Sequence, residues 1–99
     1  MIDNKKYSIK KEIAFRKMKD ETVTIVSPLT DKIITVNPVA GMIWEKLDGT
    51  NTVSEVAKYI QGVFSENDLS YEDVLADTVE IIEDFLSREL IEEKIDIEE

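Results

Sequence analysis

The feature that most constrains the fold is a change of hydrophobic period at residues 36–49, from the spacing of a strand to that of a helix. Asn37 can accept hydrogen bonds from the first free N–H groups of a helix, and Pro38 suits the first helical position. Apolar residues at helical spacing then surround the only tryptophan, Trp44: Val39, Met42, Ile43 and Leu47. Gly49 is expected to end this helix in the left-handed conformation. The segment therefore predicts a junction between a sheet and a helical part.

Three segments before the junction predict an antiparallel meander. Residues 12–18 alternate apolar and polar side chains, residues 22–26 are β-branched throughout, and residues 32–36 read KIITV. Short polar turns separate these segments, as they do in antiparallel hairpins. A sheet of three strands cannot close, so it has two open edges that can accept another strand.

Three helices are expected after the junction, over about residues 38–47, 53–64 and 71–89. Thr52 and Glu55 have the spacing of a capping box before the second helix. The order of three strands and three helices predicts one α+β domain. We expect this domain to span residues 9–91, between a flexible N-terminus at 1–8 and an acidic C-terminal tail at 92–99.

The missing residue types argue against catalysis. The chain contains no cysteine and no histidine, which removes disulfides, thiol nucleophiles, Ser–His pairs and Cys/His metal sites. A site built from carboxylates alone would need burial or close pairing to shift a pKa, and no pattern indicates either. We therefore expect no enzyme, no metal and no cofactor. The absence of a signal core or an apolar run long enough for a membrane predicts a cytoplasmic protein.

Charge is distributed unevenly along the chain. Residues 1–44 contain 8 Lys/Arg and 5 Asp/Glu, whereas residues 45–99 contain 4 and 17. The helix expected at 71–89 carries seven acidic residues and one base, Arg88. A helix that reads DNA needs basic residues, so we expect no nucleic-acid partner, and a DNA-binding protein is a less favoured alternative. The acidic face suits a partner that carries Lys or Arg.

Two surfaces are candidates for binding. Along 32–36, alternation directs Ile34 and Val36 to the core and Ile33 and Thr35 to the opposite face. This strand is either an ordinary half-exposed strand or an edge that accepts a peptide strand. The helix at 71–89 has two adjacent apolar rows: Leu75, Val79, Ile82 and Leu86, and Val74, Thr78, Ile81 and Phe85. Either both rows are core, or the second row lines a groove.

Two parts of the sequence are similar to the PqqD-like family. The first runs from VNP through IW and LDG at 36–49 and includes Thr52; the second runs from DTV through FL to LI at 77–91. The resemblance covers about residues 9–91 and implies a winged-helix domain that acts as a peptide chaperone. Such a recognition element binds the leader of a ribosomally synthesised precursor peptide during peptide modification. One departure is Glu89, where family members often have glycine.

The resemblance also implies how the leader is bound and presented. The leader would add as a strand beside 32–36, pack against the last helix, and be offered to a modifying enzyme such as a radical SAM protein. Carried over to this sequence, the peptide-binding residues are Lys32, Ile33, Ile34, Thr35, Val36, Val74, Asp77, Thr78, Ile81 and Phe85. The alternative is an adaptor subunit that binds a larger protein through the same groove. The open edge would allow a weak homodimer as well as a monomer.

Overall fold

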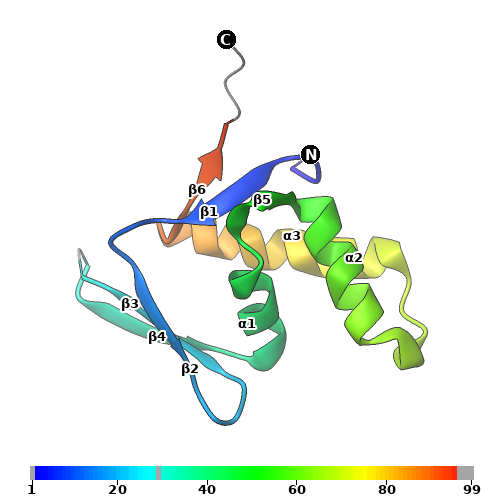
Figure 1. Cartoon of the computed structure of the whole chain (residues 1–99), viewed down its shortest axis with the longest axis horizontal. Coiled ribbons are helices and arrows are strands. Elements are labelled where there is room, and N and C mark those ends of the chain that lie inside the picture. The colour runs from blue at the N-terminus through cyan, green and yellow to red at the C-terminus, as the bar shows by residue number, and fades with distance from the viewer. Residues whose placement is uncertain (1, 29, 96–99) are drawn as a thin grey trace.

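The computed structural model describes residues 2–28 and 30–95, which form two small sheets and three α-helices (Figure 1). The first sheet is antiparallel and has the order β2-β3-β4: β2 (Ala14–Lys17), β3 (Val23–Ser27) and β4 (Lys32–Val36). The α+β fold and the predicted meander are therefore confirmed. Because β4 pairs with β3 alone among the described strands, one side of β4 is an open edge.

The three predicted helices are also confirmed, with a 3-10 turn between the last two: α1 (Pro38–Glu45), α2 (Val53–Val63), η1 (Ser65–Asn67) and α3 (Tyr71–Ser87). Asn37 caps α1, since its side chain accepts the N–H of Ala40 at 2.9 Å. Thr52 and Glu55 complete the predicted capping box at the start of α2. Local capping therefore fixes where α1 and α2 begin. No helix in the described part of the chain is long and apolar enough to span a membrane.

A second antiparallel sheet corrects the prediction for both ends of the chain. Its order is β5-β1-β6: β1 (Lys6–Ile9), β5 (Asp48–Thr52) and β6 (Ile91–Lys94). The expected flexible segment 1–8 is therefore wrong for residues 6–8, and the expected tail 92–99 is wrong for residues 92–94. These residues form strands because Tyr7, in the central strand β1, is buried in the core and only 3% exposed. Residues 1 and 96–99 lie outside the described part.

The end of α1 also differs from the prediction. The helix ends at Glu45, and the N–H groups of Lys46 and Leu47 donate to the carbonyls of Ile43 and Trp44, at 3.0 and 3.1 Å. Gly49 does take a positive φ of 85°, but it lies in β5 and caps no helix. Because the carbonyl of Leu47 accepts the N–H of Ile9 at 3.2 Å, the chain after α1 is already part of the second sheet.

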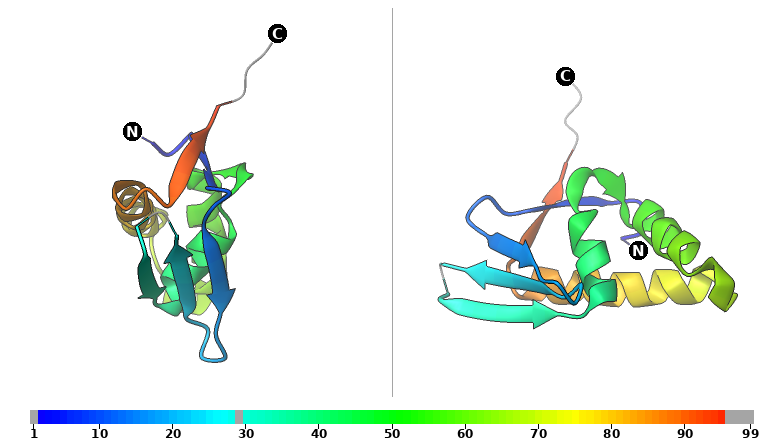
Figure 2. Two further views of the ribbon diagram at one scale, coloured as in Figure 1. Left: turned by 90° about the vertical axis from the view of Figure 1, so that its left-hand side faces the viewer. Right: turned by 60° about the horizontal axis from the view of Figure 1, so that its bottom comes forward.

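The main core lies between the meander, α1 and α3. Trp44 is fully buried and makes edge-to-face contacts with Phe15 and Phe85, with ring centroids 5.6 and 5.1 Å apart. Trp44 is therefore a core residue of α1. Gly41 allows α1 to approach β3 closely, because a Cβ at this position would lie 2.8 Å from Cγ2 of Val23. The meander stands in front of the helices in the left view of Figure 2.

The end of α3 keeps the geometry of a glycine cap without a glycine. Glu89 has a φ of 59°, in the left-handed region. The N–H of Leu90 donates to the carbonyl of Phe85 at 3.1 Å, and the N–H of Glu89 donates to that of Leu86 at 3.0 Å. These two bonds define a Schellman motif, in which glycine is the usual residue at the position of Glu89.

Candidate functional site: a groove between β4 and α3

Three adjoining cavities form a groove along β4 and α3, which we call the β4–α3 groove. The apolar cavity, of about 240 Å³, is lined by Val39, Ile43, Ile60, Phe64, Asn67, Leu69, Val74, Asp77, Thr78 and Ile81. The central cavity, of about 870 Å³, is lined by Thr35, Val36, Asn37, Val39, Ala40, Asp77, Glu80, Ile81, Glu83, Asp84, Phe85 and Ser87. The rear cavity, of about 190 Å³, is lined by Ile25, Ser27, Thr30, Lys32, Ile34, Ser87, Arg88, Glu89 and Leu90.

Shared residues make the three cavities continuous. Val39, Asp77 and Ile81 line both the apolar and the central cavity, and Ser87 lines both the central and the rear cavity. The end of β4 adjoins the middle of α3, whereas the start of β4 adjoins residues 87–90. The strand and the helix therefore run in opposite directions along the groove, as the right view of Figure 2 shows.

The predicted residues on β4 lie on the faces that their alternation indicates. Ile34 and Val36 are half-buried and pack against the core, whereas Ile33 is 69% exposed and Thr35 is exposed. Lys32 and Ile34 line the rear cavity, and Thr35 and Val36 line the central cavity. The side chain of Ile33 lines none of the three cavities, so Ile33 contributes to the candidate site only through its backbone at the strand edge.

The predicted residues on α3 form the floor and one wall of the groove. Val74, Thr78 and Phe85 are 6%, 1% and 1% exposed, so they are core residues that only border the groove. Ile81 is half-buried and Asp77 is exposed. Both apolar rows of this helix therefore pack on the core, and the edge of the second row also lines the groove.

Sequence reasoning did not assign a binding role to the residues of α1 and α2 that close the apolar cavity. The i, i+4 spacing of Val39 and Ile43 was visible in the first helix, and Phe64 stood at the end of the second. Leu69 lies in a polar loop and is 41% exposed; its carbonyl accepts a hydrogen bond from Nε2 of Gln61 at 3.0 Å. Nothing local indicates that these residues converge, because their contacts are tertiary.

The groove has an acidic wall. Asp77, Glu80, Glu83 and Asp84 line the central cavity, and no Lys or Arg lines it. Asp84 is paired with Nε of Arg88 at 3.0 Å, whereas the other three carboxylates form no ion pair with the described residues. Burial raises the pKa of Tyr7, and the charge of Glu83 adds to that increase. Asp77, Glu80 and Glu83 are thus the unpaired carboxylates that a ligand in the groove can reach.

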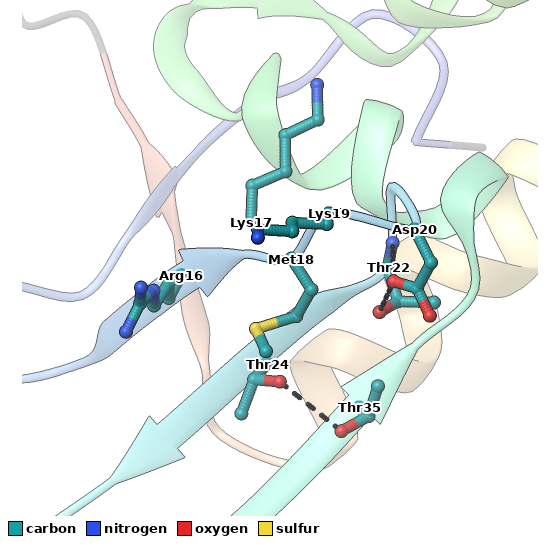
Figure 3. Close-up of a pocket in the computed structure, with 8 residues that line it drawn as sticks. All are labelled: Arg16, Lys17, Met18, Lys19, Asp20, Thr22, Thr24 and Thr35. Atoms are coloured by element: carbon teal, nitrogen blue, oxygen red, sulfur yellow. Dashed lines mark hydrogen bonds between the residues drawn. The ribbon is translucent and has the colours of Figure 1, made fainter.

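A second hollow lies on the outer face of the meander (Figure 3). It has a volume of about 570 Å³ and is lined by Arg16, Lys17, Met18, Lys19, Asp20, Thr22, Thr24 and Thr35. Most of these side chains are exposed, and Met18 is the one apolar residue among them. Thr35 lines both this hollow and the groove, so the basic outer face and the acidic groove meet at the edge of β4.

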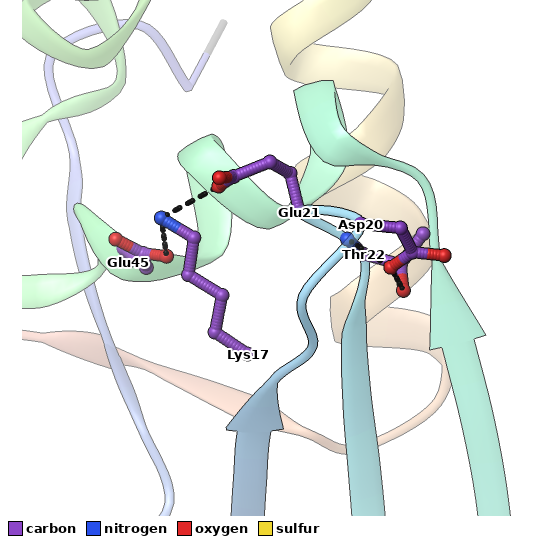
Figure 4. Close-up of polar contacts among 5 residues, drawn as sticks. All are labelled: Lys17, Asp20, Glu21, Thr22 and Glu45. Carbon is purple, nitrogen blue, oxygen red and sulfur yellow. Dashed lines mark hydrogen bonds and ion pairs between the residues drawn. The ribbon is translucent and has the colours of Figure 1, made fainter.

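Part of the charge on this outer face is neutralised within the protein (Figure 4). Nζ of Lys17 lies 2.9 Å from Oε2 of Glu21 and 3.7 Å from Oε1 of Glu45, which ties the β2–β3 hairpin to α1. The hydrogen bond with Glu21 is the main cause that raises the pKa of Lys17. Hydrogen bonds from Thr22 lower the pKa of Asp20. We therefore consider the β4–α3 groove the better candidate site.

Chemically, the groove is suited to binding a chain with apolar and cationic side chains beside a free strand edge. The described residues include no group of three or more side chains that could hold a metal ion. The carboxylates with lowered pKa values, Asp20, Asp48 and Glu55, are stabilised by local hydrogen bonds and lie outside the groove.

Known proteins resemble this chain mainly in structure. No curated protein sequence matches it significantly. The structure of TbiB1 in complex with the TbiA(beta) leader peptide has a TM-score of 0.75 and 19% identity, covering 86% of this chain and 94% of that one. A lasso peptide synthetase B1 complexed with the leader peptide has a TM-score of 0.75 and 13% identity, covering 88% and 98%. At these identities the two structures establish the fold. The family model of coenzyme PQQ synthesis protein D (PqqD) matches residues 22–91, and the chain therefore belongs to the PqqD family.

Proposed function

We propose that this protein binds the leader of a precursor peptide in the β4–α3 groove and catalyses no reaction itself. The observation that carries the proposal is the open edge of β4 beside a groove with an apolar floor. The two similar structures support it, because both are complexes with leader peptides. The missing cysteine and histidine support the non-catalytic part of the proposal.

The leader binds by strand addition. The unpaired N–H and C=O groups of β4 at residues 32–36 form hydrogen bonds with the added strand, and alternate side chains of that strand enter the groove. The apolar cavity, of about 240 Å³, has room for one large side chain, since an apolar cavity of about 150 Å³ holds a benzene molecule. The groove residues of the binding site are Lys32, Ile34, Thr35, Val36, Val74, Asp77, Thr78, Ile81 and Phe85, with Ile33 contributing its backbone.

Binding the leader leaves the rest of the precursor free for a separate modifying enzyme, such as a radical SAM protein in the cytoplasm. The protein then acts as a chaperone that raises the local concentration of the precursor near that enzyme. Asp84 in the central cavity is paired with Arg88, and Asp77, Glu80 and Glu83 are exposed. None of these carboxylates is buried as a general acid with a raised pKa would be, which is consistent with this division of labour.

The test is a titration of the ¹⁵N-labelled full chain with the leader of a short precursor encoded beside its gene. We expect the largest amide shifts at residues 32–36 and 74–85. Replacing half-buried Ile81 by Asp should weaken binding about tenfold or more, because a charge would replace an apolar contact. Phe85 is unsuitable for this purpose, since its burial against Trp44 makes it part of the core.

Lys58→Ala is the control variant, because Lys58 is exposed and lines none of the three groove cavities. Its affinity for the leader should equal that of the unmodified protein. Shifts confined to residues outside the groove, or equal losses in the two variants, would disprove the proposed binding site.

A further inference from the structure

We infer that the groove selects peptides by the order of their side chains: a bulky apolar residue followed two residues later by Lys or Arg. This inference rests on the proposed function and names the class of peptide that the groove accepts. It depends on three features described above: the apolar cavity, the unpaired carboxylates and the direction of β4.

The apolar cavity defines the first position of the motif. Its walls come from α1, α2 and α3, and Ile43, Ile60 and Val74 in its wall are at most 6% exposed. An apolar side chain that enters this cavity is removed from water at roughly 25 cal/mol per Å² of buried surface. A charged side chain there would lose its hydration without a buried partner. The first position is therefore apolar and bulky.

The unpaired carboxylates define the second position. Asp77 lies at the border between the apolar and the central cavity, and Glu80 lies one turn further along α3. Both are exposed and form no ion pair with the described residues, so a Lys or Arg that approaches them displaces no existing partner. Asp84 already pairs with Arg88, so it attracts an incoming cation less strongly.

The direction of the peptide follows from β4. Antiparallel pairs outnumber parallel pairs two- to threefold, and every strand pair in this structure is antiparallel. A strand added antiparallel to β4 runs from the end of β4 towards its start. Because β4 and α3 run in opposite directions, such a peptide passes the apolar cavity first and the acidic wall afterwards.

Helix and strand geometry set the spacing. Measured from Val74 in the apolar cavity, Glu80 lies six positions further along α3 and Asp84 lies ten, which is about 9 Å and about 15 Å at 1.5 Å per residue. An extended peptide advances about 6.8 Å in two residues and about 13.6 Å in four. Residues two and four positions after the apolar one therefore lie on the groove side near these carboxylates. The first of them meets two unpaired carboxylates, Asp77 and Glu80. The second meets Glu83, which is unpaired, and Asp84, which is paired, so the first has the stronger preference for a cation.

The residues between these positions face the other way and supply an internal control. They lie beside Ile33 and Thr35 on the outer face of the meander. The basic Arg16 is on β2, and two strand spacings separate β2 from β4, about 9.5 Å. The protein therefore interacts only weakly with charges at the outward positions of the peptide. Basic residues should be enriched at the groove-facing positions and not at the positions between them.

The experiment selects binders to the full chain from a displayed library of random peptides, after removal of peptides that also bind the Ile81→Asp variant. We expect a bulky apolar residue, an outward residue of any charge, and then Lys or Arg. For a synthesised winner, the double variant Asp77→Asn/Glu80→Gln should weaken binding about three- to tenfold at low salt. The difference should disappear near 1 M salt, where the Debye length is about 3 Å.

Glu66→Gln/Glu72→Gln is the matched control, because it removes the same charge from exposed residues that line none of the three groove cavities. The motif would be refuted if the selected groove-binding peptides showed no basic enrichment, showed the reverse order, or lost equal affinity in both double variants. None of these results would contradict leader binding. Absence of any peptide that shifts the amides of residues 32–36 would refute the proposed function itself.

Discussion

Replacing Glu89 by glycine should stabilise this protein. Glu89 holds a φ of 59° in the Schellman motif that ends α3, and this conformation costs a residue with a Cβ about 1–2 kcal/mol. Glycine adopts it without that cost, but loses about 0.4–1 kcal/mol through the greater freedom of its unfolded chain. At the midpoints of these two ranges, about 1.5 and about 0.7 kcal/mol, the net increase in the free energy of unfolding is about 0.8 kcal/mol. For a domain of this size, that corresponds to a Tm about 3–6 °C higher.

The measurement is thermal and urea unfolding of the full chain followed by circular dichroism. Glu89→Gln is the necessary control, because a negative charge near the C-terminus of a helix is itself unfavourable. Glutamine removes that charge and keeps the Cβ, so its gain in stability should be smaller than that of glycine. If glutamine stabilises as much as glycine, or if glycine lowers the Tm at an unchanged m-value, the argument from the left-handed backbone is refuted.

Three further predictions concern the packing of α1, the second sheet and a hydrogen-bonded carboxylate. Gly41→Ala should lower the free energy of unfolding, measured in urea, by about 1–2 kcal/mol, because the new Cβ would lie 2.8 Å from Cγ2 of Val23. Adding Val23→Ala should relieve this overpacking. If the losses of stability in the two single variants simply add in the double variant, the contact is not the cause. Tyr7→Ala should lower it by about 3–5 kcal/mol, since Tyr7 is 3% exposed in the central strand, whereas a flexible N-terminus would produce no loss. Hydrogen bonds from the hydroxyl and N–H of Thr50 lower the pKa of Asp48 below its ordinary 3.8, so this contact stabilises the fold above that pH and the stabilisation is lost as the pH falls through the lowered pKa. NMR titration should show the pKa of Asp48 rising towards 3.8 in Thr50→Val, and an unchanged value would contradict this cause.

The elements that the sequence predicts correctly are those with strong local signals. The β-branched run in β3 and the caps Asn37 and Thr52 specify structure through neighbours only a few residues away. The second sheet has no such signal, because β1, β5 and β6 read KYSI, DGTNT and IEEK, and their pairing joins residues as distant as Lys6 and Lys94. Gly49 illustrates the limit: its positive φ was foreseeable, but the element that contains it was not.

The sequence likewise predicts some features of the candidate site and not others. The period of a strand predicts that Ile34 points to the core and Ile33 to the opposite face, and the composition of α3 shows its acidic character. The apolar cavity is not visible, because Ile43, Ile60 and Leu69 reach it from separate elements. The continuity of the groove depends on the packing of α1 against α3, which the spacing of residues along the chain does not determine.

The pairing of β1 with β6 has a consequence for protein synthesis. The strand at Lys6–Ile9 is translated before its partner at Ile91–Lys94, and at about 5–20 residues per second the interval is about 4–17 s. The meander can form during this time, since its three strands are neighbours in the sequence. Until Lys94 has left the ribosome, one edge of β1 remains unpaired and open to other nascent chains. The second sheet is therefore completed later than the meander, and the open edge of β1 is exposed to misassembly during that interval.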